Sequence, residues 1–193
     1  MKEWQKMVTK MKKITKEVNI AVVGKYFDTG DFVLSDAYIS VIEALKISGI
    51  AENVKTNLHW LDAKKFETDT KKELAKLSSY DGILVPGGFG ETGIEGKIKV
   101  IEYARVNKIP YFGLCYGMQL MVVEYARNVL GLRDANTVEI NPKTSNPVIN
   151  IMPEQKKKLE IKEYGASMRL GTYEAMIEKG TVAFGAYKKA KVL

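Results

Sequence analysis

The segment 109–119, Ile-Pro-Tyr-Phe-Gly-Leu-Cys-Tyr-Gly-Met-Gln, most narrows what this chain can fold into. An apolar run ends there in Gly-x-Cys-x-Gly, and a pattern typical of a helix begins immediately. This order predicts a nucleophile elbow, a tight strand-to-helix turn that exposes one side chain at the edge of a sheet. Gly113 and Gly117 leave room where the backbone folds close to itself. Cys115 would then lie at a helix N-terminus, where the dipole favours the thiolate that a cysteine nucleophile needs.

A second interpretation of Cys115 stays open, because a lone cysteine in a protein is often a small buried apolar residue. The flanking glycines and the strand-to-helix position favour the nucleophile. Cys115 is the only cysteine of the chain, so no internal disulfide can form. This composition agrees with a reducing compartment, and we expect a cytoplasmic protein.

Apolar runs that end in glycine or proline alternate with helical patterns over the first 130 residues. We expect Ser35 to cap the first helix and Gly49 to end it, and we expect the apolar helix after Cys115 to be covered on nearly every side. The alternation predicts an α/β fold, a flavodoxin-like three-layer sandwich with a mostly parallel central sheet and helices on both faces. The expected strands span 18–24, 54–61, 81–86 and 109–114, and the expected helices span 35–48, 69–77, 95–107 and 118–130.

The pattern changes at both ends of the chain. Short strand-like runs over 148–152, 168–177 and 181–187 predict a small antiparallel extension, and the charged segment 154–163 is expected to be exposed. Residues 1–17 are basic, with apolar residues at helical spacing, and are expected to form a linker or helix before a single domain over 18–193.

Composition limits the partners. Thirty basic and 23 acidic residues give a net charge of +7, but no basic stretch is interleaved with aromatic residues, so we expect solvated lysines and no nucleic acid partner. No apolar run reaches the length of a membrane span, and the N-terminus lacks the apolar core of a signal peptide, so no membrane partner is expected. His59, the only histidine, lies in a strand pattern and is expected to be structural, and no metal site is expected.

The segment Gly87-Gly88-Phe89-Gly90 directly follows the third expected strand. Three glycines in four positions let backbone N–H groups turn toward a bound anion, although a plain flexible turn is the alternative. Because the strand is expected to lie beside the one that ends at Cys115, we interpret the segment as the oxyanion loop of an acyl transfer. Gly24 lacks the further glycines and the Gly-Lys-Ser/Thr of a phosphate loop, so no nucleotide site is expected.

Together these motifs resemble the class I, triad-type glutamine amidotransferases, and more closely the glutaminase domain of the CTP synthase family. The resemblance extends over nearly the whole chain. By this resemblance Cys115 forms a γ-glutamyl thioester with the substrate L-glutamine, and Glu139 holds the amino group of the substrate. The segments that support it are 23–26, 35–45, 85–90, 93–98, 103–105, 113–119, 126–129, 137–140 and 168–171. The positions implied around glutamine and its oxyanion are Gly87, Gly88, Phe89, Tyr116, Gly117, Met118 and Gln119.

The resemblance also implies features of a complete enzyme. It implies no cofactor in this domain, while ATP, Mg, UTP and GTP belong to the full-length enzyme. The implied partners are a synthetase domain of the same enzyme and further copies of the chain, a tetramer in the family. Such an enzyme is a ligase of pyrimidine biosynthesis that aminates UTP to CTP.

The sequence departs from the family at three points. No histidine follows Cys115, where the family has a His-x-Glu pair, so the chain is expected to be a C-terminally incomplete glutaminase domain. Thr92 stands where arginine is usual, which puts GTP activation in doubt, and Tyr116 stands where leucine is common. The alternatives are a catalytically silent amidotransferase-like module for binding or oligomer contacts, and a different cysteine hydrolase on the same scaffold.

Overall fold

The structure, a computed structural model, describes residues 1–24, 38–88, 92–152 and 172–193. It divides into two units, Met1–Asn150 and Ile151–Leu193, and each is described by itself below. The predicted cap Ser35, the charged segment 154–163 and the first residues of the strand predicted over 168–177 lie outside the described residues.

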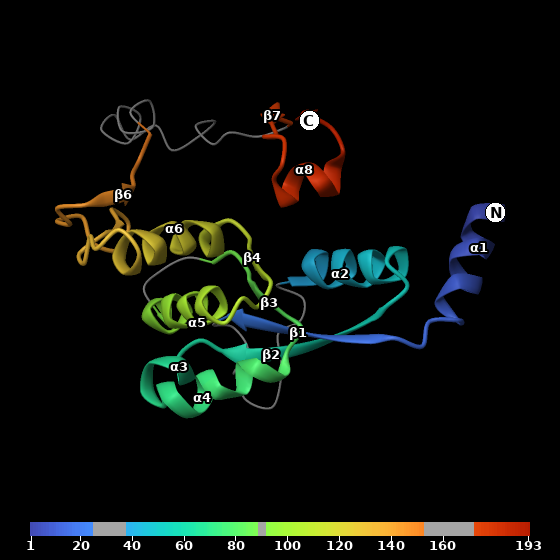
Figure 1. The fold of residues 1–193 in the computed structure, drawn as a ribbon, viewed down its shortest axis with the longest axis horizontal. Coiled ribbons are helices and arrows are strands. Elements are labelled where there is room, and N and C mark those ends of the chain that lie inside the picture. Colours follow the sequence, from blue (N-terminus) through green and yellow to red (C-terminus); the bar gives the residue numbers. More distant parts are fainter. Residues whose placement is uncertain (25–37, 89–91, 153–171) are drawn as a thin grey trace. The chain divides into compact units, whose positions relative to one another are not determined.

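The first unit is built on a four-stranded parallel sheet in the order β2-β1-β3-β4 (Figure 1). In the centre of this sheet Val22 of β1 pairs with Trp60 of β2 on one side and with Leu84 of β3 on the other. The predicted parallel sheet is therefore confirmed. The strands are β1 (Glu17–Gly24), β2 (Lys55–Asp62), β3 (Gly82–Val85) and β4 (Tyr111–Gly113).

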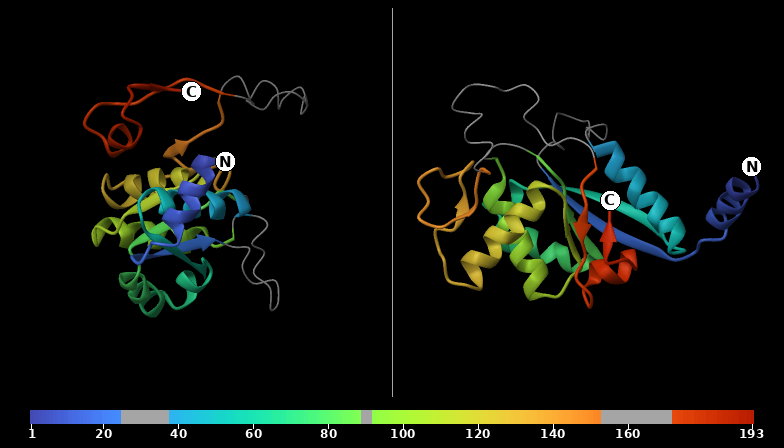
Figure 2. Two further views of the ribbon diagram at one scale, coloured as in Figure 1. Left: turned by 90° about the vertical axis from the view of Figure 1, so that its right-hand side faces the viewer. Right: turned by 90° about the horizontal axis from the view of Figure 1, so that it is seen from above.

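Helices lie on both faces of this sheet because alternate strand residues point to opposite sides (Figures 1 and 2). Val22 and Leu84 pack with Tyr38 at the start of α2, whereas Val23 and Val85 pack on the other face against α3 and α5. The three-layer prediction is thus confirmed. The helices of this unit are α1 (Lys2–Met11), α2 (Ile39–Ala51), α3 (Lys65–Thr68), α4 (Thr70–Lys76), α5 (Ile94–Val106) and α6 (Tyr116–Asn128), with a 3-10 turn, η2, over Leu77–Ser79.

The prediction that Gly49 ends the first helix is wrong. Gly49 lies inside α2, which continues to Ala51, and the chain turns at Asn53, whose φ is 59°. A Cβ atom on residue 49 would lie 2.8 Å from the carbonyl oxygen of Val54. Glycine is therefore needed here for the close approach of the helix to the chain that enters β2.

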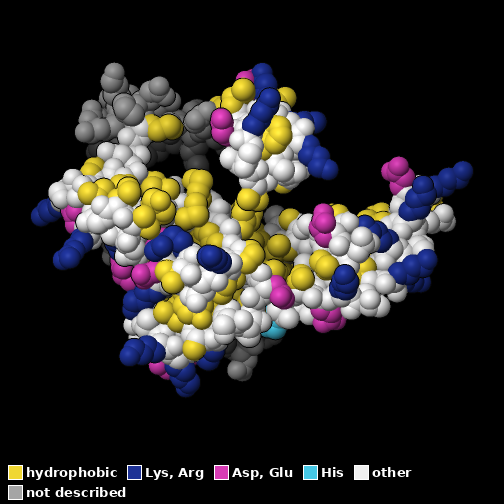
Figure 3. Space-filling model, viewed as in Figure 1, with side chains coloured by type: hydrophobic (Ala, Val, Ile, Leu, Met, Phe, Trp, Pro, Cys, Tyr) yellow, Lys and Arg dark blue, Asp and Glu magenta, His cyan; other side chains and the backbone are white. Residues whose placement is uncertain are grey.

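The expectation that α6 is covered on nearly every side is also wrong within the first unit. Its inner side, with Leu120 and Val123, packs against isoleucines of α5. Its outer side is apolar but exposed: Met118 and Tyr125 are each 49% accessible. Figure 3 shows the hydrophobic side chains that gather over this helix. The helix therefore lies beside α5 and is not enclosed by the described residues of the first unit.

The last part of the first unit contains β5 (Asn136–Thr137) and β6 (Pro147–Ile149), which pair in parallel and not in the predicted antiparallel sense. Asp134, just before β5, is bonded to the residues just before β6. Its carboxylate accepts hydrogen bonds from the backbone N–H and the hydroxyl of Ser145 and from the side chain of Asn146. These bonds, that of the Ser145 side chain foremost, hold the pKa of Asp134 at about 2.

The second unit contains an antiparallel pair, β7 (Ala175–Met176) with β8 (Lys191–Val192), in agreement with the predicted antiparallel extension. The strand predicted over 181–187 is wrong, because these residues form helix α8 (Val182–Tyr187). The hydroxyl of Thr181 accepts a hydrogen bond from the N–H of Phe184 at 3.1 Å and caps this helix. None of the described helices has the length and apolar character that crossing a bilayer requires.

Candidate active site

The turn at Cys115 has the geometry of the predicted elbow. Cys115 lies between β4 and α6 with φ 50° and ψ −104°, a conformation that is strained for a residue other than glycine. Hydrogen bonds on both sides hold it: the N–H of Leu114 donates to Val85 at 2.9 Å, and the N–H of Gln119 donates to the carbonyl of Cys115 at 3.1 Å. The strain is therefore maintained by the sheet before the turn and the helix after it.

Both glycines of the motif are required by close backbone contacts. A Cβ atom on Gly117 would lie 2.1 Å from the carbonyl oxygen of Val85, and one on Gly113 would lie 2.6 Å from the backbone nitrogen of Met118. The predicted role of these glycines is confirmed. Tyr111 adds a further anchor, because its hydroxyl donates to the carbonyl of Gly117 at 2.9 Å, and burial raises the pKa of Tyr111, which keeps the hydroxyl protonated.

The thiol of Cys115 is accessible and lies beside the predicted oxyanion loop. Cys115 is exposed, so the interpretation of a small buried apolar residue is wrong. A Cβ atom on Gly87 would lie 3.4 Å from the Cβ and 3.9 Å from the Sγ of Cys115. Strand β3, which leads to Gly87, pairs with β4, which leads to Cys115. The predicted adjacency of the glycine loop and the cysteine is therefore confirmed for Gly87; Phe89 and Gly90 lie outside the described residues.

Two segments with backbone N–H groups border the turn: Gly87 and Gly88 after β3, and the first turn of α6. Among the described residues, the N–H groups of Gly87 and Gly88 donate to no backbone carbonyl. The first turn of α6 begins with Tyr116 directly after Cys115, and the N–H groups at a helix N-terminus favour an anion. The arrangement can therefore stabilise a negative oxygen that forms next to Sγ.

Tyr116 is nearly buried, and its side chain lies among Ile94, Ile98 and Leu120. The ammonium of Lys97 lies 5.7 Å from the centroid of its ring. Sequence reasoning missed Lys97. The sequence holds one indication that Lys97 is buried: helical spacing places it on the same face of α5 as the isoleucines.

The other predicted site residues lie on α6 and in the turn after β5. Met118 is exposed and Gln119 is half-buried in the first turn of α6. Glu139 is exposed in the turn after β5, and its neighbour Ile140 packs against the cluster that contains Tyr116. This turn is thus attached to the beginning of α6, but no described contact joins Glu139 to Cys115.

His59 lies away from these groups. It is in β2, at the opposite edge of the four-stranded sheet from β4. Its Nε2 is 3.0 Å from the side-chain oxygen of Asn19, and its ring lies 5.2 Å from that of Tyr80. This placement agrees with the predicted structural role. In the part of the chain that the structure describes, no three His, Cys, Asp or Glu side chains gather as a metal site.

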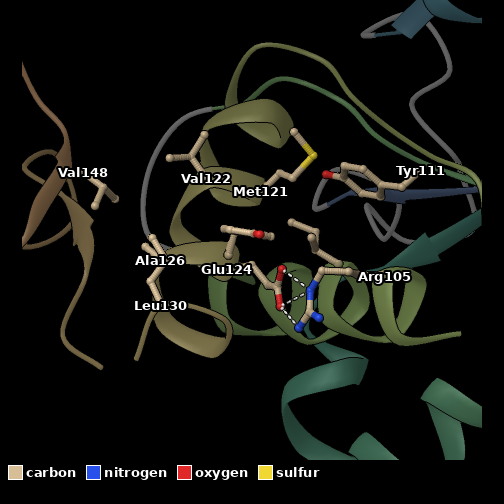
Figure 4. Close-up of a pocket in the computed structure, with 10 residues that line it drawn as sticks. Arg105, Tyr111, Met121, Val122, Glu124, Ala126, Leu130 and Val148 are labelled. Carbon is tan, nitrogen blue, oxygen red and sulfur yellow. Dashed lines mark hydrogen bonds and ion pairs between the residues drawn. The ribbon is translucent and has the colours of Figure 1, made fainter. Parts of the chain in front are cut away.

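An apolar groove of about 410 Å³ lies beside α6, and neither Cys115 nor Gly87 lines it (Figure 4). Its wall includes an ion pair with a buried carboxylate and an arginine side chain that is 34% exposed. Arg105 of α5 donates to both carboxylate oxygens of Glu124 of α6 over 2.7–3.1 Å. Asn128 donates to the same carboxylate. The groove is lined by Ile101, Arg105, Tyr111, Met121, Val122, Glu124, Tyr125, Ala126, Leu130 and Val148.

Comparisons with known proteins agree with this geometry. A family model described as glutamine amidotransferase class-I matches residues 33–190. The CTP synthase of Caldanaerobacter subterraneus subsp. tengcongensis is 52% identical over 188 residues, which cover 97% of this chain and 33% of that protein. The CTP synthase of Pyrococcus furiosus is 47% identical over 192 residues, which cover 100% of this chain and 34% of that protein.

A solved structure is also similar. The glutaminase domain of Trypanosoma brucei CTPS with bound acivicin matches with a TM-score of 0.79 and 36% identity. The match covers 90% of this chain and 64% of that one. The chain thus spans about a third of the length of the curated relatives that it matches and about two thirds of this structure.

Proposed function

The chain belongs to the class-I glutamine amidotransferase family, and we propose that it is the glutaminase domain of a CTP synthase, which hydrolyses L-glutamine through a thioester on Cys115. The observation that supports this most directly is the exposed Cys115 at a strained elbow. A Cβ atom built on Gly87 would lie 3.9 Å from its Sγ. A nucleophile that faces a glycine loop is the arrangement that acyl transfer requires.

In the proposed reaction, Sγ of Cys115 attacks the side-chain amide carbon of glutamine. The amide oxygen becomes an oxyanion, and the backbone N–H groups of Gly88 and Tyr116 donate to it. Loss of one such donor costs about 10²–10³ in rate in enzymes that acylate a nucleophile. The intermediate expels ammonia and leaves a γ-glutamyl thioester, and water then releases glutamate and regenerates the thiol.

The departing nitrogen needs a proton, and the sequence holds no histidine after Cys115. The proposal therefore assigns to this chain the nucleophile, the oxyanion donors and the glutamine site. It does not assign the group that moves protons. A general acid–base typically contributes about 10²–10⁴ in rate, so turnover by the chain alone is expected to be slow compared with the first acylation.

The amino acid end of glutamine is assigned to Glu139 and Gln119. A carboxylate pairs with the substrate ammonium by charge-assisted hydrogen bonds. The exposed side chain of Glu139 in a turn attached to α6 agrees with this assignment. Phe89 and Met118, by the resemblance, line the same site.

The wider proposal, which the family resemblance implies, is that ammonia passes to a synthetase domain that aminates UTP with ATP and Mg; the similar proteins are named CTP synthase. Its partners would be that domain and further copies of the chain in the tetramer of the family, in the cytoplasm. Because Thr92 replaces the usual arginine, we propose that GTP activates this chain weakly or not at all.

The test uses acivicin, an α-amino acid with an electrophilic ring in place of the side-chain amide. We expect acivicin to label Cys115 far faster than iodoacetamide does at equal concentration, and L-glutamine to slow acivicin selectively, both measured by intact-protein mass spectrometry. Cys115→Ser should take up no label. Equal labelling by both reagents without protection by glutamine would contradict a formed glutamine site and leave only a reactive thiol.

A further inference from the structure

Lys97 is a charged residue in an apolar environment. It belongs to α5 and is 2% exposed, next to Ile98 and within the same helix face as Ile94 and Ile101. An ammonium is rarely buried unless it has an interaction to compensate for the water that it loses. One such interaction is with Tyr116, because the Nζ atom lies 5.7 Å from the ring centroid, within cation–π range.

The position of Tyr116 gives this contact a functional meaning. Tyr116 directly follows Cys115, and its backbone N–H is one of the two proposed oxyanion donors. Its side chain is 3% exposed, so the ring fixes the orientation of the residue. Lys97, for its part, lies in the first turn of the helix that follows the glycine loop. The contact thus joins the beginnings of the two helices that follow the two halves of the oxyanion site.

The contact depends on the residue type at 116, where leucine is common in the family that this sequence resembles. An aliphatic side chain can fill the same apolar space but presents no π face to a cation. In this chain the tyrosine ring therefore adds an electrostatic link that packing alone does not supply.

We propose that Lys97 is a positioning residue: by holding its ammonium against the ring of Tyr116, it fixes the backbone N–H of Tyr116 toward the oxyanion. Lys97 itself contacts neither the thiol nor the substrate in this proposal. The inference rests on the proposed function, because it assigns a purpose to an oxyanion donor.

The experiment compares two reagents on the same thiol. Acivicin reacts by addition to a C=N bond, followed by loss of chloride, so negative charge develops on an atom that the oxyanion donors can stabilise. Iodoacetamide alkylates the sulfur by direct displacement of iodide and needs no such donor. The ratio of the two rate constants therefore reports the oxyanion site separately from the reactivity of the thiol.

We expect Lys97→Met and Tyr116→Leu each to lower acivicin labelling about tenfold, a fraction of the loss of a whole donor, while iodoacetamide labelling changes less than about twofold. The double variant should be no slower than either single one, since both remove the same contact. Lys97→Arg should restore most of the rate, because a guanidinium also stacks on an aromatic ring.

Lys99→Met is the matched control. It removes the same charge from the same helix, but Lys99 donates to the hydroxyl of Thr70 at 3.0 Å and not toward Tyr116. Its labelling ratio should equal that of the wild type. Thermal melts of all variants identify any that fail to fold. If Lys97→Met does not fold, Lys97→Arg still tests whether a positive charge at this position supports acivicin labelling.

The outcomes separate the two proposals. If acivicin does not label the wild type, the proposed function fails and this inference fails with it. If acivicin labels the wild type but Lys97→Met lowers both rates equally or neither, or if the two single effects add in the double variant, Lys97 only supports the fold and the inference alone is wrong.

Discussion

Replacing Gly117 by alanine is the sharpest test of the elbow. Gly117 is the second residue of α6, and its φ is not positive, so alanine is compatible with its backbone conformation. Only space opposes the change: the new Cβ would lie 2.1 Å from the carbonyl oxygen of Val85, whereas non-bonded heavy atoms normally approach to about 3.5 Å. The backbone of β3 or α6 must therefore move by more than about 1 Å.

The expected loss of stability follows from three terms. Overpacking costs about 1–3 kcal/mol, and the rigid backbone on both sides places this site at the upper end. The same carbonyl of Val85 accepts the hydrogen bond of Leu114, which weakens when the carbonyl moves, at about 1 kcal/mol. Against these losses, alanine is more favourable than glycine within a helix by about 1 kcal/mol. The net loss is about 3 kcal/mol, or a fall of about 6–12 °C in Tm.

The assay is urea unfolding followed by circular dichroism, combined with acivicin labelling of Cys115. Gly185→Ala is the control, because its new Cβ in α8 meets no atom within 4 Å, and it should lose no stability. We expect Gly117→Ala to lose both stability and labelling. If it unfolds within about 0.5 kcal/mol of the wild type and is labelled equally fast, the close contact described here does not shape the elbow.

Three further predictions concern the surroundings of the site. Arg105→Met should destabilise by about 2–4 kcal/mol in urea unfolding, because it leaves the carboxylate of Glu124 buried without its cation; an unchanged midpoint would refute this. The pKa of Asp134 is about 2 in the folded protein, below its unfolded value, so its hydrogen bonds stabilise above about pH 4 and are lost toward pH 2. Asp134→Asn should therefore reduce the fall of the urea midpoint between pH 5 and pH 2, and an equally steep fall would contradict the assignment. Thr181→Ala should cost α8 about 1 kcal/mol and speed hydrogen exchange of the Phe184 amide, whereas unchanged exchange would show that the cap is unimportant.

The central sheet and the elbow could be predicted from the sequence because their signals are local. The apolar runs before Gly24, Pro86 and Gly113 have the length of buried strands, and each is followed by residues that stop a strand. The order of strands and helices then fixes a parallel sheet, and neighbouring parallel strands bring the residues after them to one edge. The adjacency of Gly87 and Cys115 follows from these two steps.

The features that sequence reasoning missed depend on distant partners. Residues 181–187 have an alternating apolar pattern, but the hydroxyl of Thr181 caps a helix there. Gly49 resembles a helix stop, and only the nearby carbonyl of Val54 reveals that the helix continues past it. The cation–π contact of Lys97 joins positions 19 residues apart in sequence and has no periodic signature. Such contacts are set by three-dimensional packing, which a pattern of residue types does not encode.

The strands of the sheet differ greatly in length, and this difference governs how the sheet opens. Strand β1 forms eight pairs with β2, whereas β4 forms three pairs with β3 and has no second neighbour among the described residues. Amide groups in a short outer strand open to solvent by local fluctuations that cost far less than global unfolding. The backbone that presents Cys115 should therefore exchange its amide hydrogens well before the interior of β1 does. The reactive thiol thus follows a short, weakly protected strand, while the long central strand stays closed.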